Sequence, residues 1–383
     1  MHKMMLARRA RLMAFSAPQA LTDAKTSSQL EISALQAYPV REPVSRRSYT
    51  IIRLQTRGGL VGYGECAKVT AQELAQVLQA VRGKEVSQFE TVRQQLKNAP
   101  AGLMAALNMA MLDAAGRSVK APVYQVLGGP TRNKCRALAP LEGTTDTELV
   151  ASVRSAREAG FKAFLVPTPP VVWRNQGQAF VLAARKRLDA LRQAAGPGMD
   201  FVLDGGGSLV PGDAASLAEA FERYHLLWLD EPCGALNLGA VKKIAAENVT
   251  PVGLGRFIQQ PGAFQDLLRE DAIDILRPDI SLNGISQIRQ MAAIAETYYV
   301  AVAPYHNGGP VATAAALQLA ASLPNFFIQQ IPLPQADPDR KMRAALAGGV
   351  EVVKDGFAEL PVGPGLGITV NEKALEQYKE SAE

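Results

Sequence analysis

The chain has 383 residues, more than the roughly 250–300 at which a single hydrophobic core stops growing, so we expect one large domain and a smaller one. Hydrophobic residues make up 48% and charged residues 20%, a balance that excludes an intrinsically disordered protein. The net charge of +5 is small for this length, and basic residues cluster only at Arg8, Arg9 and Arg11, so no nucleic-acid partner is expected. No run approaches the roughly 18 apolar residues of a membrane span, so no membrane partner is expected either.

The cysteines and the N-terminal residues bear on where the protein works. Cys66, Cys135 and Cys233 are too widely spaced for a disulfide framework or a metal finger, and they fit a reducing compartment, so we expect a cytoplasmic protein. Residues 1–29 are predicted to form a disordered tail. Paired arginines before the short apolar run 12–15 leave export through a twin-arginine-like segment open as the alternative, although no clear cleavage site follows.

The first structural segment is predicted to be an α+β domain over residues 30–133. It begins with three β-type runs, and a glycine turn at 57–59 joins the last two, which is typical of a hairpin. From Thr70 to Lys120 the apolar period becomes helical and includes a stretch rich in small residues around Asp113. The three β-type runs are 30–38, 48–56 and 60–66.

The next segment, residues 134–335, is predicted to be a (β/α)8 barrel of the TIM type. Short apolar runs alternate there with amphipathic helical stretches, which is typical of a parallel sheet, and eight is the number of strands that closes a barrel. A doubly wound open sheet shares the alternation, but no helix opens with a Gly-rich phosphate fingerprint. The eight runs are 136–140, 163–167, 201–203, 226–229, 251–254, 273–276, 300–304 and 326–329.

Polar residues end consecutive runs at intervals of 23 to 26 residues, which is about the length of one strand, one helix and two loops. Such residues should ring the carboxyl end of the barrel, where barrels of this type place their sites. They are Asp204, Asp230, Arg256, Asp279, Tyr305 with His306, and Gln330.

Three carboxylates in this ring suggest a metal. Asp204, Asp230 and Glu231 follow adjacent predicted strands, and converging hard oxygen ligands are what Mg²⁺ requires. A single acidic residue at a strand end more often caps a helix or pairs with a cation. Three acidic residues at the ends of adjacent barrel strands favour a metal site.

Several motifs together resemble the mandelate racemase and muconate lactonizing enzyme group of the enolase superfamily, and within it the galactonate-dehydratase-like acid-sugar dehydratases. The resemblance covers about residues 30–380. It implies a modified barrel with a cap formed by the N-terminal domain and a C-terminal segment, residues 336–383, that returns to it. The motifs are Gly62-Tyr63-Gly64-Glu65-Cys66, the small-residue helix around Asp113, Leu203-Asp204-Gly205, Trp228-Leu229-Asp230-Glu231-Pro232, Asp274-Ile275-Leu276-Arg277-Pro278-Asp279, Ala303-Pro304, and Gly363-Pro364-Gly365-Leu366-Gly367.

The resemblance implies a mechanism and a ligand set. In this family three acidic residues bind Mg²⁺, which stabilises the enediolate formed when a base removes the proton α to a carboxylate. Asp204 fills the first ligand position, and Asp230 fills the second with a shorter side chain than the usual Glu, with Glu231 beside it. The third position holds Arg256.

Other family positions also depart from the pattern. Lys162 lies too early in its strand to be the catalytic lysine, and the positions after it are apolar. Asp279 matches the residue that orients the catalytic His, but Tyr305 stands where that His belongs and His306 follows it. Gln330 replaces an acidic group. Because strand residues alternate between faces, the one-residue slip points His306 away from the mouth unless the loop absorbs it.

Arg256 decides the functional prediction, since a guanidinium carries no lone pair for a metal. We expect Arg256 to replace the ion and to neutralise the carboxylates itself. The chain is therefore predicted to be a divergent family member that binds a small carboxylate or acid sugar at the barrel mouth, with Mg²⁺-dependent proton abstraction impaired or altered. The alternative is an active Mg²⁺-dependent acid-sugar dehydratase or racemase, with His306 and Asp279 as its base dyad.

Two further expectations concern the base and the partners. His306 is the candidate base, because His2 lies in the tail and His225 follows a helix. The resemblance implies a homo-oligomer, and it implies that cap loops such as 37–48 select the substrate. Arg41, Arg46 and Arg47 lie in that loop, where the alternative is ordinary surface solvation.

Overall fold

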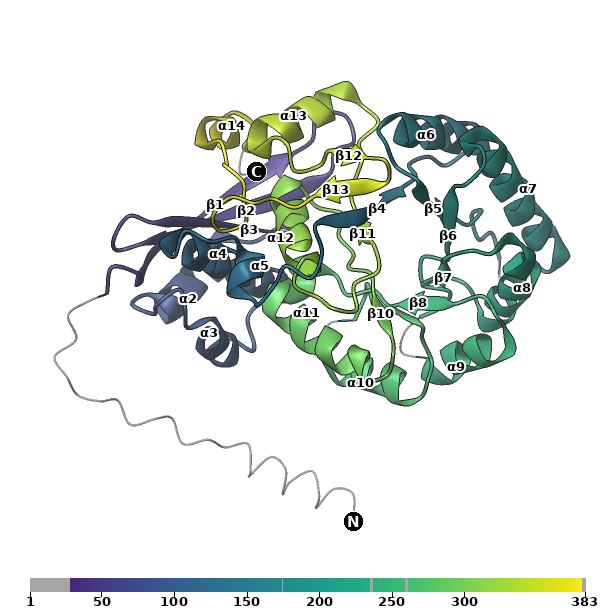
Figure 1. Cartoon of the computed structure of the whole chain (residues 1–383), viewed down its shortest axis with the longest axis horizontal. Helices are drawn as coiled ribbons and strands as arrows, with labels where there is room; N and C mark the ends of the chain where they lie inside the picture. The colour runs from purple at the N-terminus through teal and green to yellow at the C-terminus, as the bar shows by residue number, and fades with distance from the viewer. Residues whose placement is uncertain (1–27, 174, 235–236, 259–260, 381–383) are drawn as a thin grey trace, which may run out of the picture.

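The structure is a computed structural model that describes residues 28–173, 175–234, 237–258 and 261–380. It comprises a smaller cap and a larger ring of strands surrounded by helices (Figure 1). Almost all of the predicted tail, including His2, Arg8, Arg9 and Arg11, lies outside these residues. None of the helices in the described ranges is both long and apolar enough to cross a membrane.

The cap contains an antiparallel sheet in the order β1-β2-β3, and the predicted hairpin joins β2 to β3. The turn is possible because Gly59 adopts φ 81°, a left-handed conformation that favours glycine. Helices cover one face of this sheet (Figure 1). The elements of the cap are β1 (Ile32–Arg41), β2 (Ser48–Thr56), β3 (Val61–Cys66), α2 (Ala71–Val81), α3 (Phe89–Gln95), α4 (Ala101–Ser118) and α5 (Val123–Val126).

Helix α4 packs unusually close to β3, which explains the small residues on both. A Cβ at Gly64 would overlap the carbonyl oxygen of Ala106, and one at Gly62 would overlap that of Ala110. Glycine on the strand and alanine on the helix therefore let the two backbones approach each other. The helix is buried along most of its length, since it also contacts α11 (Ile280–Glu296) of the barrel.

The barrel strands, β4 to β11, pair in parallel around a ring. Between successive strands the chain returns along helices on the outside (Figure 1). The strands are β4 (Lys134–Pro140), β5 (Ala163–Pro167), β6 (Asp200–Asp204), β7 (Trp228–Asp230), β8 (Val252–Leu254), β9 (Ile275–Leu276), β10 (Ala301–Val302) and β11 (Gln329–Gln330), and the remaining helices are α6 (Asp146–Glu158), α7 (Gln178–Ala195), α8 (Pro211–Phe221), α9 (Leu238–Glu247), α10 (Pro261–Arg269), α12 (Pro310–Ala320) and α13 (Asp337–Ala347).

The ring is completed where the last strand meets the first. β11 pairs with β4, and Val302 of β10 bonds to the segment just before β11: its N–H donates to Asn325 O and its carbonyl accepts from Phe327 N, at 2.9 and 2.8 Å. The interior is filled by side chains from several strands, among them Trp228, Val202 and Leu165. The predicted α/β barrel with an α+β cap is confirmed.

The C-terminal segment leaves the barrel and returns to the cap. It forms the antiparallel pair β12 (Val353–Lys354) and β13 (Phe357–Glu359), and β13 adds to β4. Farther on, Leu366 N donates to Asp113 Oδ1 of α4 at 2.7 Å, while Asp113 Oδ2 accepts from Tyr63 N of β3 at 2.9 Å. One buried carboxylate of α4 thus joins strand β3 to the C-terminal segment. The segment ends with α14 (Glu372–Gln377) beside β1.

The contact between β3 and α4 predicts a specific weakness. We expect Gly64→Ala to destabilise the protein by about 1–3 kcal/mol, because the added methyl group forces strand and helix apart. Gly239→Ala is the control, since a Cβ at Gly239 in α9 meets no atom of the described residues within 4 Å. Chemical denaturation measures both, and equal free energies of unfolding would contradict the close packing.

Candidate functional site

A cavity of about 170 Å³ opens at the carboxyl ends of the barrel strands. Its walls combine apolar side chains with a few polar ones, as in most small-molecule sites. Four residues of the predicted polar ring line it, each following a different strand. The lining residues are Pro140, Leu141, Leu165, Pro167, Asp204, Arg256, Tyr305, Asn307 and Gln330.

Arg256 lies among the three carboxylates predicted as metal ligands. Its Nη1 and Nη2 donate to the two oxygens of Asp204 at 3.0 and 2.5 Å, a bidentate pair. Its Nε lies 3.5 Å from Asp230 Oδ2 and 3.8 Å from Glu231 Oε1. The turn that aims it inward depends on Gly255, whose φ of 143° favours glycine.

A second guanidinium, Arg277, binds the middle carboxylate. Its Nε and Nη2 lie 2.9 and 3.3 Å from the two oxygens of Asp230, and Trp228 Nε1 donates to Asp230 Oδ1 at 2.6 Å. Arg277 also donates to Gln330 Oε1 at 2.9 Å and is fully buried. Arg277 was not among the predicted site residues, because its contacts with Asp230 and Gln330 join segments far apart in the chain.

Glu231 is held mainly by the backbone. Its Oε1 accepts from Gly255 N at 2.7 Å and from Arg256 N at 2.6 Å, while Oε2 is buried without a hydrogen-bond partner among the described atoms. Its φ of 43° is left-handed, which costs free energy in a residue other than glycine. Burial, and then the charge of Asp230, raise the pKa of Glu231 to about 7.

The cluster balances its own charge. Asp204 and Asp230 face the two guanidiniums of Arg256 and Arg277, and burial and the charge of Asp230 raise the pKa of Glu231, which favours its neutral form. Buried charges are tolerated when they are paired and hydrogen-bonded in this way.

The same pairing bears on Mg²⁺, the metal that the resemblance implies. Both oxygens of Asp204 accept from Arg256, both oxygens of Asp230 accept from Arg277, and Glu231 Oε1 accepts two amides. A divalent cation needs oxygen lone pairs and would be repelled by two guanidiniums. Across the described ranges, no group of three or more His, Cys, Asp or Glu side chains is arranged to hold a metal ion. The residues in this arrangement therefore do not fit Mg²⁺.

Aromatic rings hold the guanidiniums from the cavity side. The ring centre of Tyr305 lies 5.1 Å from the Arg256 guanidinium carbon and 5.7 Å from that of Arg277. Phe257, which is largely exposed, lies 5.4 Å from Arg256. These cation–π contacts fix the guanidinium planes. Tyr305 occupies the mouth position that the family resemblance assigns to a His.

The predicted base dyad is not formed in the described structure. Asp279 Oδ1 accepts from Ser281 N at 2.7 Å, at the start of α11, and no hydrogen bond joins it to His306. His306 is fully buried, with Nε2 3.3 Å from Thr313 Oγ1. The alternation of side chains explains this, because Tyr305 faces the mouth and its neighbour faces α12. Burial, aided by Arg343 and Arg47, lowers the pKa of His306 to about 3, so the ring is neutral.

The other sequence candidates take different places. Gln330 lines the cavity, and its Nε2 donates to the carbonyl of His306 at 3.2 Å. Lys162 is exposed and lies 3.8 Å from Asp355, away from the cavity lining. Arg41, predicted to lie in a cap loop, is the last residue of strand β1 and pairs with Glu380.

Comparisons with known proteins agree with the fold and the motifs. The family model described as "Mandelate racemase / muconate lactonizing enzyme, N-terminal domain" matches residues 34–128, and the one described as "Enolase C-terminal domain-like" matches residues 148–374. The chain belongs to the mandelate racemase and muconate lactonizing enzyme group of the enolase superfamily. The family resemblance predicted from the motifs is thus confirmed.

Individual members of this superfamily cover most of the chain. A D-galactonate dehydratase family member of Streptomyces bingchenggensis is 27% identical over 375 residues, 87% of this chain and 90% of that protein. D-xylonate dehydratase of Haloferax volcanii is 26% identical over 289 residues, 72% of this chain and 69% of that protein. The structure of 3,6-anhydro-D-galactonate cycloisomerase from Zobellia galactanivorans matches with a TM-score of 0.80 at 23% identity, covering 92% of this chain and all of that one.

Removal of Arg256 should be costly. We expect Arg256→Ala to lower the free energy of unfolding by about 3–5 kcal/mol, because it leaves buried carboxylates without their partner. Arg269→Ala, which removes an exposed ion pair with Asp266, is the control and should change little. The melting temperature of Arg256→Glu should instead rise when Mg²⁺ is added. A wild type strongly stabilised by Mg²⁺, together with a near-neutral Arg256→Ala, would show that Arg256 has not taken the metal's place.

The site also predicts a pH dependence through Asp279. Burial raises its pKa to about 7 from an ordinary value near 3.8, so the folded state favours the protonated acid. The stability it contributes is complete below pH 3.8 and is lost as the pH rises through 7. Asp279→Asn should therefore flatten the decline in unfolding free energy between pH 5 and pH 7. Asp337→Asn, a change in an exposed residue, should leave that decline in place.

Proposed function

We propose that the protein binds an acid sugar, or a related small carboxylate, at the barrel mouth, and that Arg256 contacts the ligand's carboxylate. The observation that carries this is the position of Arg256 on the cavity wall with only two of its five N–H groups bonded to Asp204. Each terminal nitrogen keeps one further N–H, and a charged N–H donor of this kind binds a carboxylate oxygen strongly. Relatives named for galactonate and xylonate support the ligand class.

The remaining cavity residues suit a polyhydroxylated acid. Gln330 and Asn307 offer amide groups to hydroxyls, while Leu141, Leu165 and Pro167 give an apolar wall against which C–H groups pack. Asp204 and Tyr305 keep the Arg256 guanidinium in one orientation. The site is thereby pre-organised, which reduces the entropic cost of binding.

Within this proposal the metal-dependent chemistry of the family is altered or impaired. Mg²⁺, where family members bind it, neutralises the enediolate formed by proton abstraction. Here the fixed charges of Arg256 and Arg277 are the groups available to stabilise negative charge on a bound carboxylate. Neither titratable side chain at the cavity is well suited to remove a proton. Asp204 is paired with Arg256, and burial raises the pKa of Tyr305.

Dehydration of an acid sugar with Mg²⁺ is the second candidate, and the names of the curated relatives favour it over binding alone. It requires Arg256 to leave Asp204, so that the carboxylates become free to coordinate. Loss of the α-proton and of the β-hydroxyl as water would then give a 2-keto-3-deoxy acid.

Calorimetry with D-galactonate and D-xylonate tests the proposal. Binding should be measurable in EDTA and should weaken about tenfold in Arg256→Lys, because an ammonium cannot keep the bidentate pair with Asp204 and also donate to a ligand in the same geometry. Lys162→Ala is the control, as this side chain lies away from the cavity. Failure of both acids to bind, with and without Mg²⁺, would refute the proposal. Formation of a 2-keto-3-deoxy acid only when Mg²⁺ is added would establish the second candidate.

A further inference from the structure

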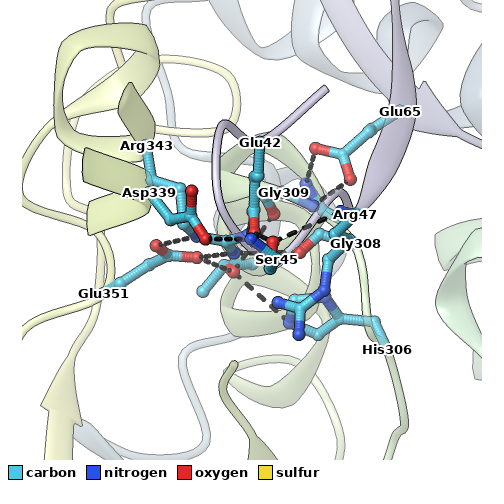
Figure 2. Close-up of polar contacts among 12 residues, drawn as sticks. Glu42, Ser45, Arg47, Glu65, His306, Gly308, Gly309, Asp339, Arg343 and Glu351 are labelled. Carbon is cyan, nitrogen blue, oxygen red and sulfur yellow. Dashed lines mark hydrogen bonds and ion pairs between the residues drawn. The ribbon is translucent and has the colours of Figure 1, made fainter. Parts of the chain in front are cut away.

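A carboxylate of the cap reaches into the barrel next to the mouth. Glu65, in β3, is 1% exposed, and its Oε1 accepts from Gly309 N while its Oε2 accepts from Ala312 N at 3.1 Å (Figure 2). Both amides belong to the start of α12. A Cβ at Gly308 or Gly309 would overlap the Glu65 carboxylate or the Tyr49 ring, so the backbone is shaped to receive the carboxylate.

Other buried charges hold the same stretch of backbone. Arg343 of α13 donates to Gly308 O at 2.9 Å and also binds Glu42 and Glu351 (Figure 2). Two residues before Gly308, the His306 ring contacts Thr313, and the Thr313 hydroxyl donates to Glu351 at 2.7 Å. Segment 306–309 is therefore fixed at three places by groups outside the barrel mouth.

Two residues in or next to segment 306–309 line the ligand cavity. They are Tyr305 and Asn307, and the Tyr305 ring packs on the Arg256 guanidinium. Glu65 binds the backbone only two residues after Asn307 and four after Tyr305. A shift of the Gly309 amide would therefore be transmitted over a short, buried length of chain to the ring that orients Arg256.

We propose that Glu65 is a positioning residue of the barrel mouth: by holding the start of α12 it sets where Tyr305 and Asn307 stand, so that a cap residue controls the shape of the ligand cavity. Its effect on ligand affinity rests on the proposed function, whereas its effect on Tyr305 does not. The charged and titratable groups that face Glu65 are Arg343, Glu351 and Tyr49, from three other segments.

The competing explanation is that Glu65 only stabilises the fold, and Asp113 gives a matched control for it. Asp113 is also a buried carboxylate that accepts from two backbone amides, those of Tyr63 and Leu366, but its contacts lie inside the cap. Loss of either carboxylate should lower the melting temperature. Loss of Glu65 alone should move Tyr305.

Fluorine NMR on protein labelled with 3-fluorotyrosine separates these explanations. The chain has nine tyrosines, and the resonance of Tyr305 is the one that Tyr305→Phe removes. We expect Glu65→Gln to shift or split this resonance, because the amide NH₂ cannot accept from a backbone N–H, and Asp113→Asn to leave it in place. If Glu65→Gln does not fold, Glu65→Asp keeps the charge but is too short to reach both amides, and the same displacement is expected.

Affinity for D-galactonate supplies the second measurement. It should fall about tenfold in Glu65→Gln and remain within twofold of wild type in Asp113→Asn. An unmoved Tyr305 resonance in the folded Glu65 variants, or an equal displacement in Asp113→Asn, would overturn the inference. A wild type that binds no acid sugar would count against the proposed function, while the Tyr305 resonance would still decide the role of Glu65.

Discussion

The pairing of Arg256 with Asp204 is the contact on which the chemistry of the barrel mouth depends. It places a permanent positive charge between carboxylates that would otherwise repel one another in a largely buried site. The surrounding features follow from that charge. Gly255 turns the side chain inward, Tyr305 covers its face, and Arg277 repeats the arrangement one layer deeper on Asp230. Relatives of the chain are named as galactonate and xylonate dehydratases, and the proposed carboxylate contact of Arg256 follows from the same charge.

Much of the fold could be predicted because its signals are local and periodic. The glycine turn at 57–59 identified the β2–β3 hairpin, and the regular spacing of polar residues identified the barrel, since one strand and one helix consume a nearly constant length of chain. Individual strand limits were harder to predict. The run 300–304 forms a strand only at Ala301–Val302, because Pro304 has no N–H to donate, although Ala303 N and Tyr305 N still donate to Leu276 O and Pro278 O.

The candidate site was predictable where it follows from the strand–helix spacing and from strand alternation. The spacing placed Arg256 at the barrel mouth with the carboxylates, and alternation indicated that His306 would face away once Tyr305 occupied the mouth. Neither rule could show that Arg277 would bind the oxygens of Asp230, because this contact joins segments far apart in the chain. Neither showed that Asp279 would accept from Ser281 N at the start of α11. The contact of Glu65 with Gly309 N could not be predicted either, because the two residues are 244 positions apart in the chain.

The return of the C-terminal segment to the cap constrains how the protein can be made. Asp113 bonds to Leu366, which lies 253 residues farther along the chain, so this contact of the cap cannot form until Leu366 has been synthesised. At a translation rate of about 5–20 residues per second, the delay is roughly 10–50 s. Strand β3 and helix α4 both precede Leu366 in the chain, so their close packing forms before Asp113 gains this partner. Their close packing therefore serves the nascent chain on the ribosome as well as the finished molecule.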